Sequence, residues 1–231
     1  MPESPTRPRR SLEPRASGSL ADRAYEELRD RLVTLDIAPG APLDEDRLIQ
    51  ELEVGRTPIR EALKRLALER LVQVYPRRGS FAADINITDL ADIADVRMPL
   101  EGHAAFRAAE RLTPDAEKQL DELVRELRAI TPATDNHELL ELDTRIHRFI
   151  YRATRNAYLE QSLTVYLNLS TRIWHLVIDR MPGGYDPAEH LELLAAVKAR
   201  DPERARRALV DHVVAFEDAI HAALRKDGSA V

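Results

Sequence analysis

The chain has 231 residues, of which 44% are hydrophobic and 32% charged, with a formal net charge of −6 and no cysteine. This composition suits one or two domains with a sizeable core, and it excludes disulfide frameworks and thiolate metal sites. No apolar run approaches the roughly 18 residues of a membrane helix, and the N-terminus lacks the apolar segment of a secretory signal, so we expect a cytoplasmic protein without membrane contact.

Residues 1–19 are rich in Pro, Ser and Arg and have almost nothing apolar to bury, which predicts a disordered tail. An amphipathic helix is expected next, over residues 24–35, followed by a turn at Pro39-Gly40. Asp44 is placed to cap a second helix that ends near Leu52.

Residues 54–66, VGRTPIREALKRL, predict a helix with two different faces. One face carries cations that recur every four residues: Arg56, Arg60 and Lys64. The opposite face carries apolar residues at i, i+4 and i+7: Ile59, Leu63 and Leu66. Such a helix packs one side on a core and can present the other to phosphate, although a surface helix with merely solvated charges is the alternative.

Pro58 indicates where this basic helix begins. A proline fits only in the first turn, so the helix should begin between Gly55 and Thr57. Arg56 and Arg60 then lie at the N-terminal end, which helix-turn-helix proteins insert into the major groove.

Two short strands are expected downstream, over residues 71–74 and 80–83. The segment between them, Pro76-Arg77-Arg78-Gly79, indicates a β-ribbon with a basic tip. Three helices followed by such a ribbon predict a winged helix-turn-helix over residues 20–85.

The charge distribution supports this assignment. Residues 1–85 carry 15 Lys/Arg and 15 Asp/Glu, against 19 and 25 in the remainder, so the acidic excess lies entirely in the second part. Residues 56–80 have seven basic and two acidic side chains, and it is this local field that would meet DNA phosphates.

The first part of the chain resembles the DNA-binding domain of the GntR regulators. The resemblance rests on the APG turn, LDEDRL, RTPIREAL and the RRG wing, in this order between Ala24 and Ile85. It implies that Arg56, Thr57 and Arg60 contact the operator and that Gly79 lets the wing backbone approach DNA. Gly55 stands where the family commonly has Ser or Thr, and Glu53 holds a turn position often occupied by glycine.

After a linker at 86–88, in which Asn86 or Thr88 would cap the next helix, the rest of the chain predicts an antiparallel bundle of six helices over residues 89–226. Apolar residues recur at helical spacing in blocks 89–111, 114–130, 137–153, 156–180, 187–200 and 202–226. Breaks are indicated by Thr113-Pro114, Thr131-Pro132, Arg155-Asn156, Pro182-Gly183-Gly184 and Asp201-Pro202. Pro99 is expected to kink or interrupt the first helix. Residues 227–231 are a short tail.

Asp143 and His147 are four residues apart on one predicted helix, so their side chains share a face. Most such pairs are hydrogen-bonded structural partners, but the spacing also suits a metal chelate. His190 and His212 lie in later blocks, and in an antiparallel bundle they can converge with the pair. Three histidines and a carboxylate suit Zn best, with Ni, Mn or Fe as alternatives.

The second part of the chain resembles the FCD domain of the FadR-type branch of the GntR regulators. The segments that carry the resemblance are DVRMPLE, LDTRIHRFIYRATRN, EHLELLAAV and DPERARRALVDHV. It implies that Asp143, His147, His190 and His212 are metal ligands and that Arg97 faces the effector cavity, although Arg97 also suits a salt bridge to Glu101. The other histidines match no ligand position and are expected to be structural or exposed: His103, His137, His175 and His221.

These features together predict a homodimeric transcription regulator, a repressor rather than an activator. A small carboxylate metabolite bound at the metal site would control its affinity for double-stranded operator DNA. We expect no enzymatic activity, since no general base accompanies the ligands in an HExxH arrangement. The alternatives are a metal-dependent enzyme of the bundle fused to a DNA-binding domain, and an architectural DNA-binding protein without effector.

Overall fold

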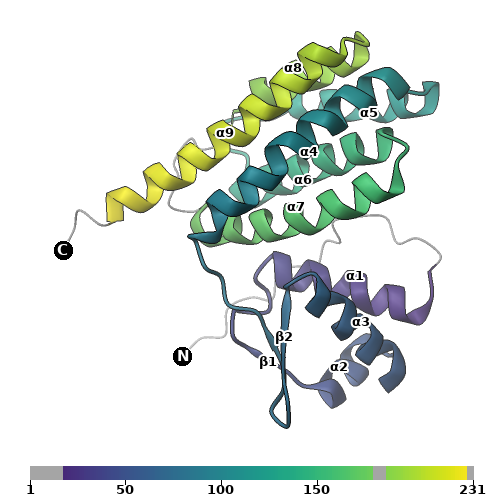
Figure 1. The fold of residues 1–231 in the computed structure, drawn as a ribbon, viewed down its shortest axis with the longest axis vertical. Helices are drawn as coiled ribbons and strands as arrows, with labels where there is room; N and C mark the ends of the chain where they lie inside the picture. The colour runs from purple at the N-terminus through teal and green to yellow at the C-terminus, as the bar shows by residue number, and fades with distance from the viewer. Residues whose placement is uncertain (1–17, 179–185, 228–231) are drawn as a thin grey trace.

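A computed structural model of the chain describes residues 18–178 and 186–227 (Figure 1). Most of the predicted N-terminal tail, the expected turn at Pro182-Gly183-Gly184 and residues 228–231 lie outside this range. The described residues form a small domain of three helices and a three-stranded sheet, followed by a larger domain of six helices. The predicted winged helix-turn-helix followed by a helical bundle is confirmed.

The winged domain has its own core, formed by apolar residues of all three helices and of the sheet. Its elements in chain order are α1 (Leu20–Val33), β1 (Pro42–Leu43), α2 (Glu45–Leu52), α3 (Arg56–Leu68), β2 (Val72–Tyr75) and β3 (Gly79–Ala82). The strand order is β1-β3-β2, antiparallel, with Val72 opposite Ala82 and Tyr75 opposite Gly79. Strand β1 was not predicted, because two residues are too few to show an alternation of apolar and polar side chains.

Side-chain caps fix the first two helices. The Ser19 hydroxyl accepts a hydrogen bond from the Asp22 backbone N–H, while Asp22 accepts from the Ser19 N–H in return. Asp44 caps α2 as predicted. Glu53 ends α2 in the left-handed conformation at φ 52°, which explains why glycine is favoured there.

The helical domain is built around α4, which packs against α6, α7, α8 and α9. Its elements are α4 (Asp89–Arg111), α5 (Pro114–Arg128), α6 (Asn136–Ala153), α7 (Ala157–Val177), α8 (Pro187–Lys198) and α9 (Pro202–Asp227). Gly102 permits the close approach of α4 and α9, because a Cβ there would lie 2.8 Å from Val210 Cγ2. No helix among the described residues is both long and apolar enough to cross a membrane.

The structure decides two expectations about α4: whether Pro99 interrupts the helix, and whether Asn86 or Thr88 caps it. The helix runs through Pro99 without a break, because packing on four other helices outweighs the loss of one backbone hydrogen bond. Thr88 precedes α4 but makes no side-chain cap. Asn86 acts instead: its side chain accepts from the Thr88 N–H and donates to Asp89.

The two domains meet where α1 faces α7 (Figure 1). Arg172 of α7 is 2% exposed, and its guanidinium crosses the junction. Its Nε donates to the Leu32 carbonyl at 3.1 Å, and its Nη2 donates to the Ala83 carbonyl at 2.6 Å. One side chain thus holds the end of α1 and the residue that follows β3 against the bundle.

Replacing Arg172 by Met should loosen this junction. Two carbonyls would lose their donor while the aliphatic volume is kept, so we expect the free energy of unfolding to fall by about 1–2 kcal/mol. Differential scanning calorimetry would detect the loss as a lower Tm of the winged domain. Arg107→Met, which removes a surface pair with Glu110, is the control. Equal Tm values for the two variants would contradict this role of Arg172.

Candidate metal centre and nucleic-acid interface

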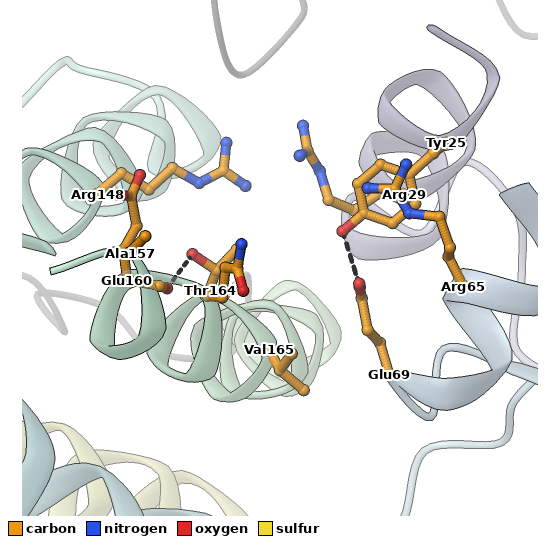
Figure 2. A pocket seen from close by; sticks show the side chains of 10 residues that line it. Tyr25, Arg29, Arg65, Glu69, Arg148, Ala157, Glu160, Thr164 and Val165 are labelled. Carbon is orange, nitrogen blue, oxygen red and sulfur yellow. Dashed lines mark hydrogen bonds between the residues drawn. The ribbon is translucent and has the colours of Figure 1, made fainter. Parts of the chain in front are cut away.

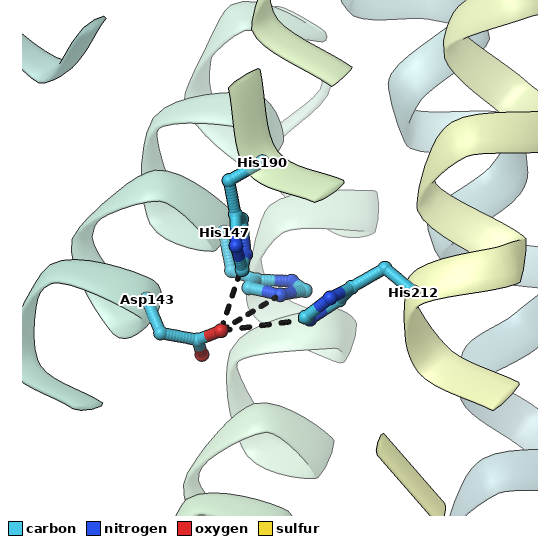
Figure 3. A group of neighbouring side chains, drawn as sticks. All are labelled: Asp143, His147, His190 and His212. Carbon is cyan, nitrogen blue, oxygen red and sulfur yellow. Dashed lines mark ion pairs between the residues drawn. The ribbon is translucent and has the colours of Figure 1, made fainter. Parts of the chain in front are cut away.

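Three helices bring Asp143, His147, His190 and His212 together in the interior of the helical domain (Figure 3). Asp143 and His147 project from α6, His190 from α8 and His212 from α9. One ligand atom from each of the four lies within 4.8 Å of all the others. Asp143 Oδ1 is 3.1 Å from His190 Nε2, 3.5 Å from His212 Nε2 and 3.9 Å from His147 Nε2.

Two carboxylates orient the imidazoles from behind. Glu189 Oε2 is hydrogen-bonded to His212 Nδ1 at 2.8 Å. Glu101 Oε2 lies 3.0 Å from His147 Nδ1 as an ion-pair contact, and the Tyr151 hydroxyl is hydrogen-bonded to the same nitrogen at 3.4 Å. When Nδ1–H donates to a carboxylate, the Nε2 lone pair is left to point at the centre of the cluster. This is the arrangement that metal-binding histidines adopt in proteins.

The residues present fit a divalent metal ion. His147 is fully buried, and its Nε2 has no hydrogen-bond partner among the described residues. A buried polar atom is costly unless something satisfies it, and a metal at the centre of the four donors would do so. Imidazole nitrogen and carboxylate oxygen are the donors preferred by Zn and its neighbours.

The protein environment shifts the pKa values of the metal-ligand candidates in different directions. Burial opposes ionisation of Asp143, but the adjacent imidazoles outweigh it and hold the pKa of the carboxyl well below its ordinary value. Burial and the neighbouring His212 lower the pKa of His190 to about 4. Burial also disfavours protonated His212, yet hydrogen bonds to Asp143 and Glu189 raise its pKa to about 9. A metal would therefore find Asp143 and His190 ready and would displace a proton from His212.

Arg97 lies in the same buried network, and the salt bridge considered from the sequence is present. Its Nε donates to Glu101 Oε1 at 2.6 Å, and its Nη1 donates to the Ser170 hydroxyl at 2.8 Å. Tyr151 also donates to Glu101 Oε1, at 2.7 Å. Glu101 therefore links Arg97 to His147.

The candidate DNA-contacting side chains of α3 are all exposed: Arg56, Thr57, Arg60 and Lys64. The helix begins at Arg56 with Gly55 as its N-cap, so Pro58 falls in the first turn as predicted. Gly55 offers no side-chain cap, which leaves the N-terminal N–H groups without that protein partner. Ile59, Leu63 and Leu66 are buried on the opposite face.

Acidic residues at the start of α2 pair with these arginines. Arg56 Nη2 contacts Asp46 Oδ1 at 2.5 Å, and Arg60 Nε contacts Glu45 Oε2 at 2.9 Å. Both arginine side chains are more than half exposed. The carboxylates hold the guanidinium groups in place and also reduce the local positive field that DNA would meet.

Removing one of these acids should strengthen non-specific DNA binding. Exposed ion pairs contribute about 0.2–1 kcal/mol, so Asp46→Asn is expected to tighten binding to a random-sequence duplex by roughly two- to five-fold. Fluorescence anisotropy at fixed salt would measure this. Asp115→Asn removes an exposed acid of α5 and should leave binding unchanged. An equal gain in both variants would show that only net charge matters.

The wing is a tight hairpin with a basic tip. Arg77 and Arg78 are exposed, and Arg78 stacks over Tyr75 at 5.3 Å from the ring centroid. Gly79 has φ 93°, a conformation that L side chains rarely adopt, although a Cβ there would meet no atom within 4 Å. Glycine is thus favoured by backbone conformation rather than by crowding within the protein.

The remaining histidines whose side chains the structure describes lie apart from the metal cluster. His103 is exposed on α4. His137 and His175 stack on each other, with their Nδ1 atoms 3.3 Å apart, and burial together with His137 lowers the pKa of His175 to about 4. The side chain of His221 lies outside the described residues.

Three residues that support these sites or the domain junction could not be assigned a role from the sequence. Glu101 was noted only as a partner for Arg97, and Glu189 only as part of the EHLELLAAV segment. Arg172 gave no signal at all. Each acts through a contact with another helix, and sequence spacing reveals only neighbours on the same helix.

Comparison with known proteins agrees with both domains. Residues 20–81 match the family described as "Bacterial regulatory proteins, gntR family", and residues 92–215 match the FCD domain. The transcriptional repressor RspR of Escherichia coli (strain K12) is 28% identical over 200 residues, covering 85% of this chain and 86% of RspR. A transcriptional regulator in an unstable DNA locus of Streptomyces ambofaciens is 32% identical over 204 residues, covering 85% and 83%.

The fold is also found among solved structures. E. coli McbR/YncC superposes with a TM-score of 0.74 at 23% identity, over 90% of this chain and 99% of that chain. The matched families contain transcription regulators and not enzymes, so the alternative of a metal-dependent enzyme is not supported. The chain belongs to the GntR family of DNA-binding transcription regulators, in the branch whose second domain is an FCD domain.

Proposed function

We propose that this regulator is a metal-dependent repressor whose affinity for operator DNA is controlled by a small organic acid bound in the helical domain. The observation that carries the proposal is the convergence of three imidazole Nε2 atoms and one carboxylate oxygen in a buried site, with Glu101 and Glu189 behind two of the imidazoles. Relatives named as repressors, such as RspR, support repression rather than activation of transcription.

Asp143, His147, His190 and His212 would hold the ion, with Zn favoured over Ni, Mn or Fe. Four protein donors leave coordination positions open when the ion takes more than four ligands, and a bound ion would offer these to a carboxylate oxygen. The protein supplies four donors in a fixed arrangement that is buried from solvent. The acid must favour one arrangement of the domains over another, because a ligand with equal affinity for both shifts nothing.

Arg97 is proposed to contact the effector while it positions Glu101. Arg97→Gln separates the two roles. If Arg97 serves both, as proposed, the variant loses the acid response and also binds metal more weakly, because Glu101 orients His147. If it serves the effector alone, the variant keeps its metal affinity, and if it serves only Glu101, the metal-loaded variant keeps the acid response.

In the DNA complex, Arg56, Thr57 and Arg60 would reach base edges and Lys64 a phosphate, with Arg77, Arg78 and Gly79 of the wing beside them. One recognition helix reads only a few base pairs, so we propose a homodimer that binds two half-sites about one helical turn apart. Such a regulator would act in the cytoplasm, where its operator lies.

Native mass spectrometry of protein purified without chelator tests the proposal first. We expect a dimer with one metal ion per chain, with or without an added organic acid. Operator binding measured by anisotropy should then respond to a candidate carboxylate in the metal-loaded protein and not after chelation. A protein that stays metal-free after incubation with Zn, Ni, Mn or Fe would refute the metal-dependent part.

A further inference from the structure

A cavity lies between the two domains, apart from the metal centre (Figure 2). It has a volume of about 580 Å³, within the range of small-molecule sites. Its walls come from α1 and α3 of the winged domain and from α6 and α7 of the helical domain. Neither the family resemblance nor the proposed effector site accounts for it.

Two buried arginines face each other across this cavity, one from each domain. Arg29 of α1 is 6% exposed, Arg148 of α6 is 4% exposed, and their guanidinium groups point toward one another (Figure 2). Arg29 contacts Asp30 at 2.8 Å, and Arg148 donates to the Asn168 amide oxygen at 3.3 Å. Arg29 donates from both Nε and Nη2 to Asp30, which offsets part of its charge. An anion between the two guanidinium groups would give both arginines a further acceptor and would so stabilise the closed junction.

Further polar and charged side chains complete the walls of the interdomain cavity. Arg65 lies over the Tyr25 ring, 3.9 Å from its centroid, and also pairs with Asp22. Burial and the adjacent Glu69 raise the pKa of Tyr25 to about 12, so its hydroxyl stays neutral, and it donates to Glu69 at 2.8 Å. Gln161 and Thr164 add polar groups from α7. The lining holds three arginines and two glutamates, Glu69 and Glu160.

We propose that this interdomain cavity binds a small oxyanion, carrying phosphate or carboxylate groups, held between Arg29 and Arg148. Guanidinium groups form paired hydrogen bonds with such anions, and both arginines come from helices that the anion would hold together. Arg148 directly follows His147, so one turn of α6 serves both the metal centre and the interdomain cavity. The bound anion would fix the winged domain against the bundle. This inference does not rest on the metal-dependent function.

Isothermal titration calorimetry of the full chain with inorganic phosphate, and separately with citrate, tests the proposal. The protein is first treated with chelator, so that no metal ion accepts the anion. We expect saturable binding of at least one of the two, and the stronger one identifies phosphate or carboxylate as the favoured group. Arg29→Gln and Arg148→Gln should each weaken binding by about ten-fold or more, since each removes a charged donor pair.

Two variants serve as controls. Arg145→Gln removes a half-exposed arginine of the same helix, which pairs with Glu126 away from the cavity. Arg60→Ala removes a cation of α3 on the proposed DNA-facing surface. Both should bind within two-fold of the unmodified chain. Arg148→Lys keeps the charge but loses the paired donors, so it should bind more tightly than Arg148→Gln and less tightly than the unmodified chain. If Arg148→Gln folds poorly, Arg29→Gln still tests the site.

The proposal is overturned if neither phosphate nor citrate binds, or if Arg29→Gln and Arg148→Gln variants of unchanged Tm bind as well as Arg145→Gln while Arg60→Ala abolishes binding. The latter result would place the anion on the DNA-facing surface. Metal-dependent operator control is read separately, by anisotropy with metal-loaded protein. Either proposal can therefore fail without the other.

Discussion

His147→Ala is expected to remove stoichiometric metal from the protein and to abolish the response of operator binding to the organic acid. His147 is fully buried, and its Nε2 is aimed into the cluster with no other partner among the described residues. Loss of a group that merely orients a ligand typically lowers metal affinity 10- to 100-fold, so loss of the ligand itself should exceed about 100-fold. Inductively coupled plasma mass spectrometry after dialysis against metal-free buffer measures the content directly.

The matched control is His103→Ala, which removes an exposed histidine of α4 and should leave metal content at one ion per chain. Glu101→Gln gives an intermediate case. It keeps the volume beside His147 Nδ1 but removes the carboxylate, so affinity should fall by about 10- to 100-fold. If His147→Ala keeps its metal, the four residues are an ordinary buried hydrogen-bond cluster and the ion lies elsewhere.

Sequence signals that act within a few residues predicted the starts of several helices correctly. Pro58 predicted the start of α3, because proline is tolerated only in the first turn, and the helix begins at Arg56. Thr113-Pro114 and Asp201-Pro202 likewise precede α5 and α9. These signals concern single helix ends, and backbone chemistry within a few residues decides them.

Contacts between distant segments were not predictable in the same way. The sequence placed Asp143 and His147 on one face, but only the packing of α8 and α9 on the bundle brings His190 and His212 to them. Residues that act across the domain junction, Arg148 and Arg172, gave no local signal. Pro99 shows the opposite failure, because a strong local rule was overruled by tertiary packing.

Arg60→Ala is expected to weaken operator binding by about 1–3 kcal/mol, or roughly 5- to 150-fold, with the Tm unchanged. The side chain is 55% exposed on the face of α3 opposite the buried Ile59 and Leu63, so its loss should leave the core intact. Its pair with Glu45 is also exposed and contributes little to folding. Arg56→Ala should behave in the same way.

The pattern of the loss distinguishes base reading from phosphate contact. A variant that loses a base contact should lose affinity for the operator and much less for a random duplex. Lys64→Ala, if Lys64 meets a phosphate, should weaken both equally and reduce the slope of log K against log salt by about one. Arg107→Ala, on α4, is the control for net charge. Unaltered operator affinity in Arg56→Ala and Arg60→Ala would show that α3 does not read the DNA, even though the family assignment would stand.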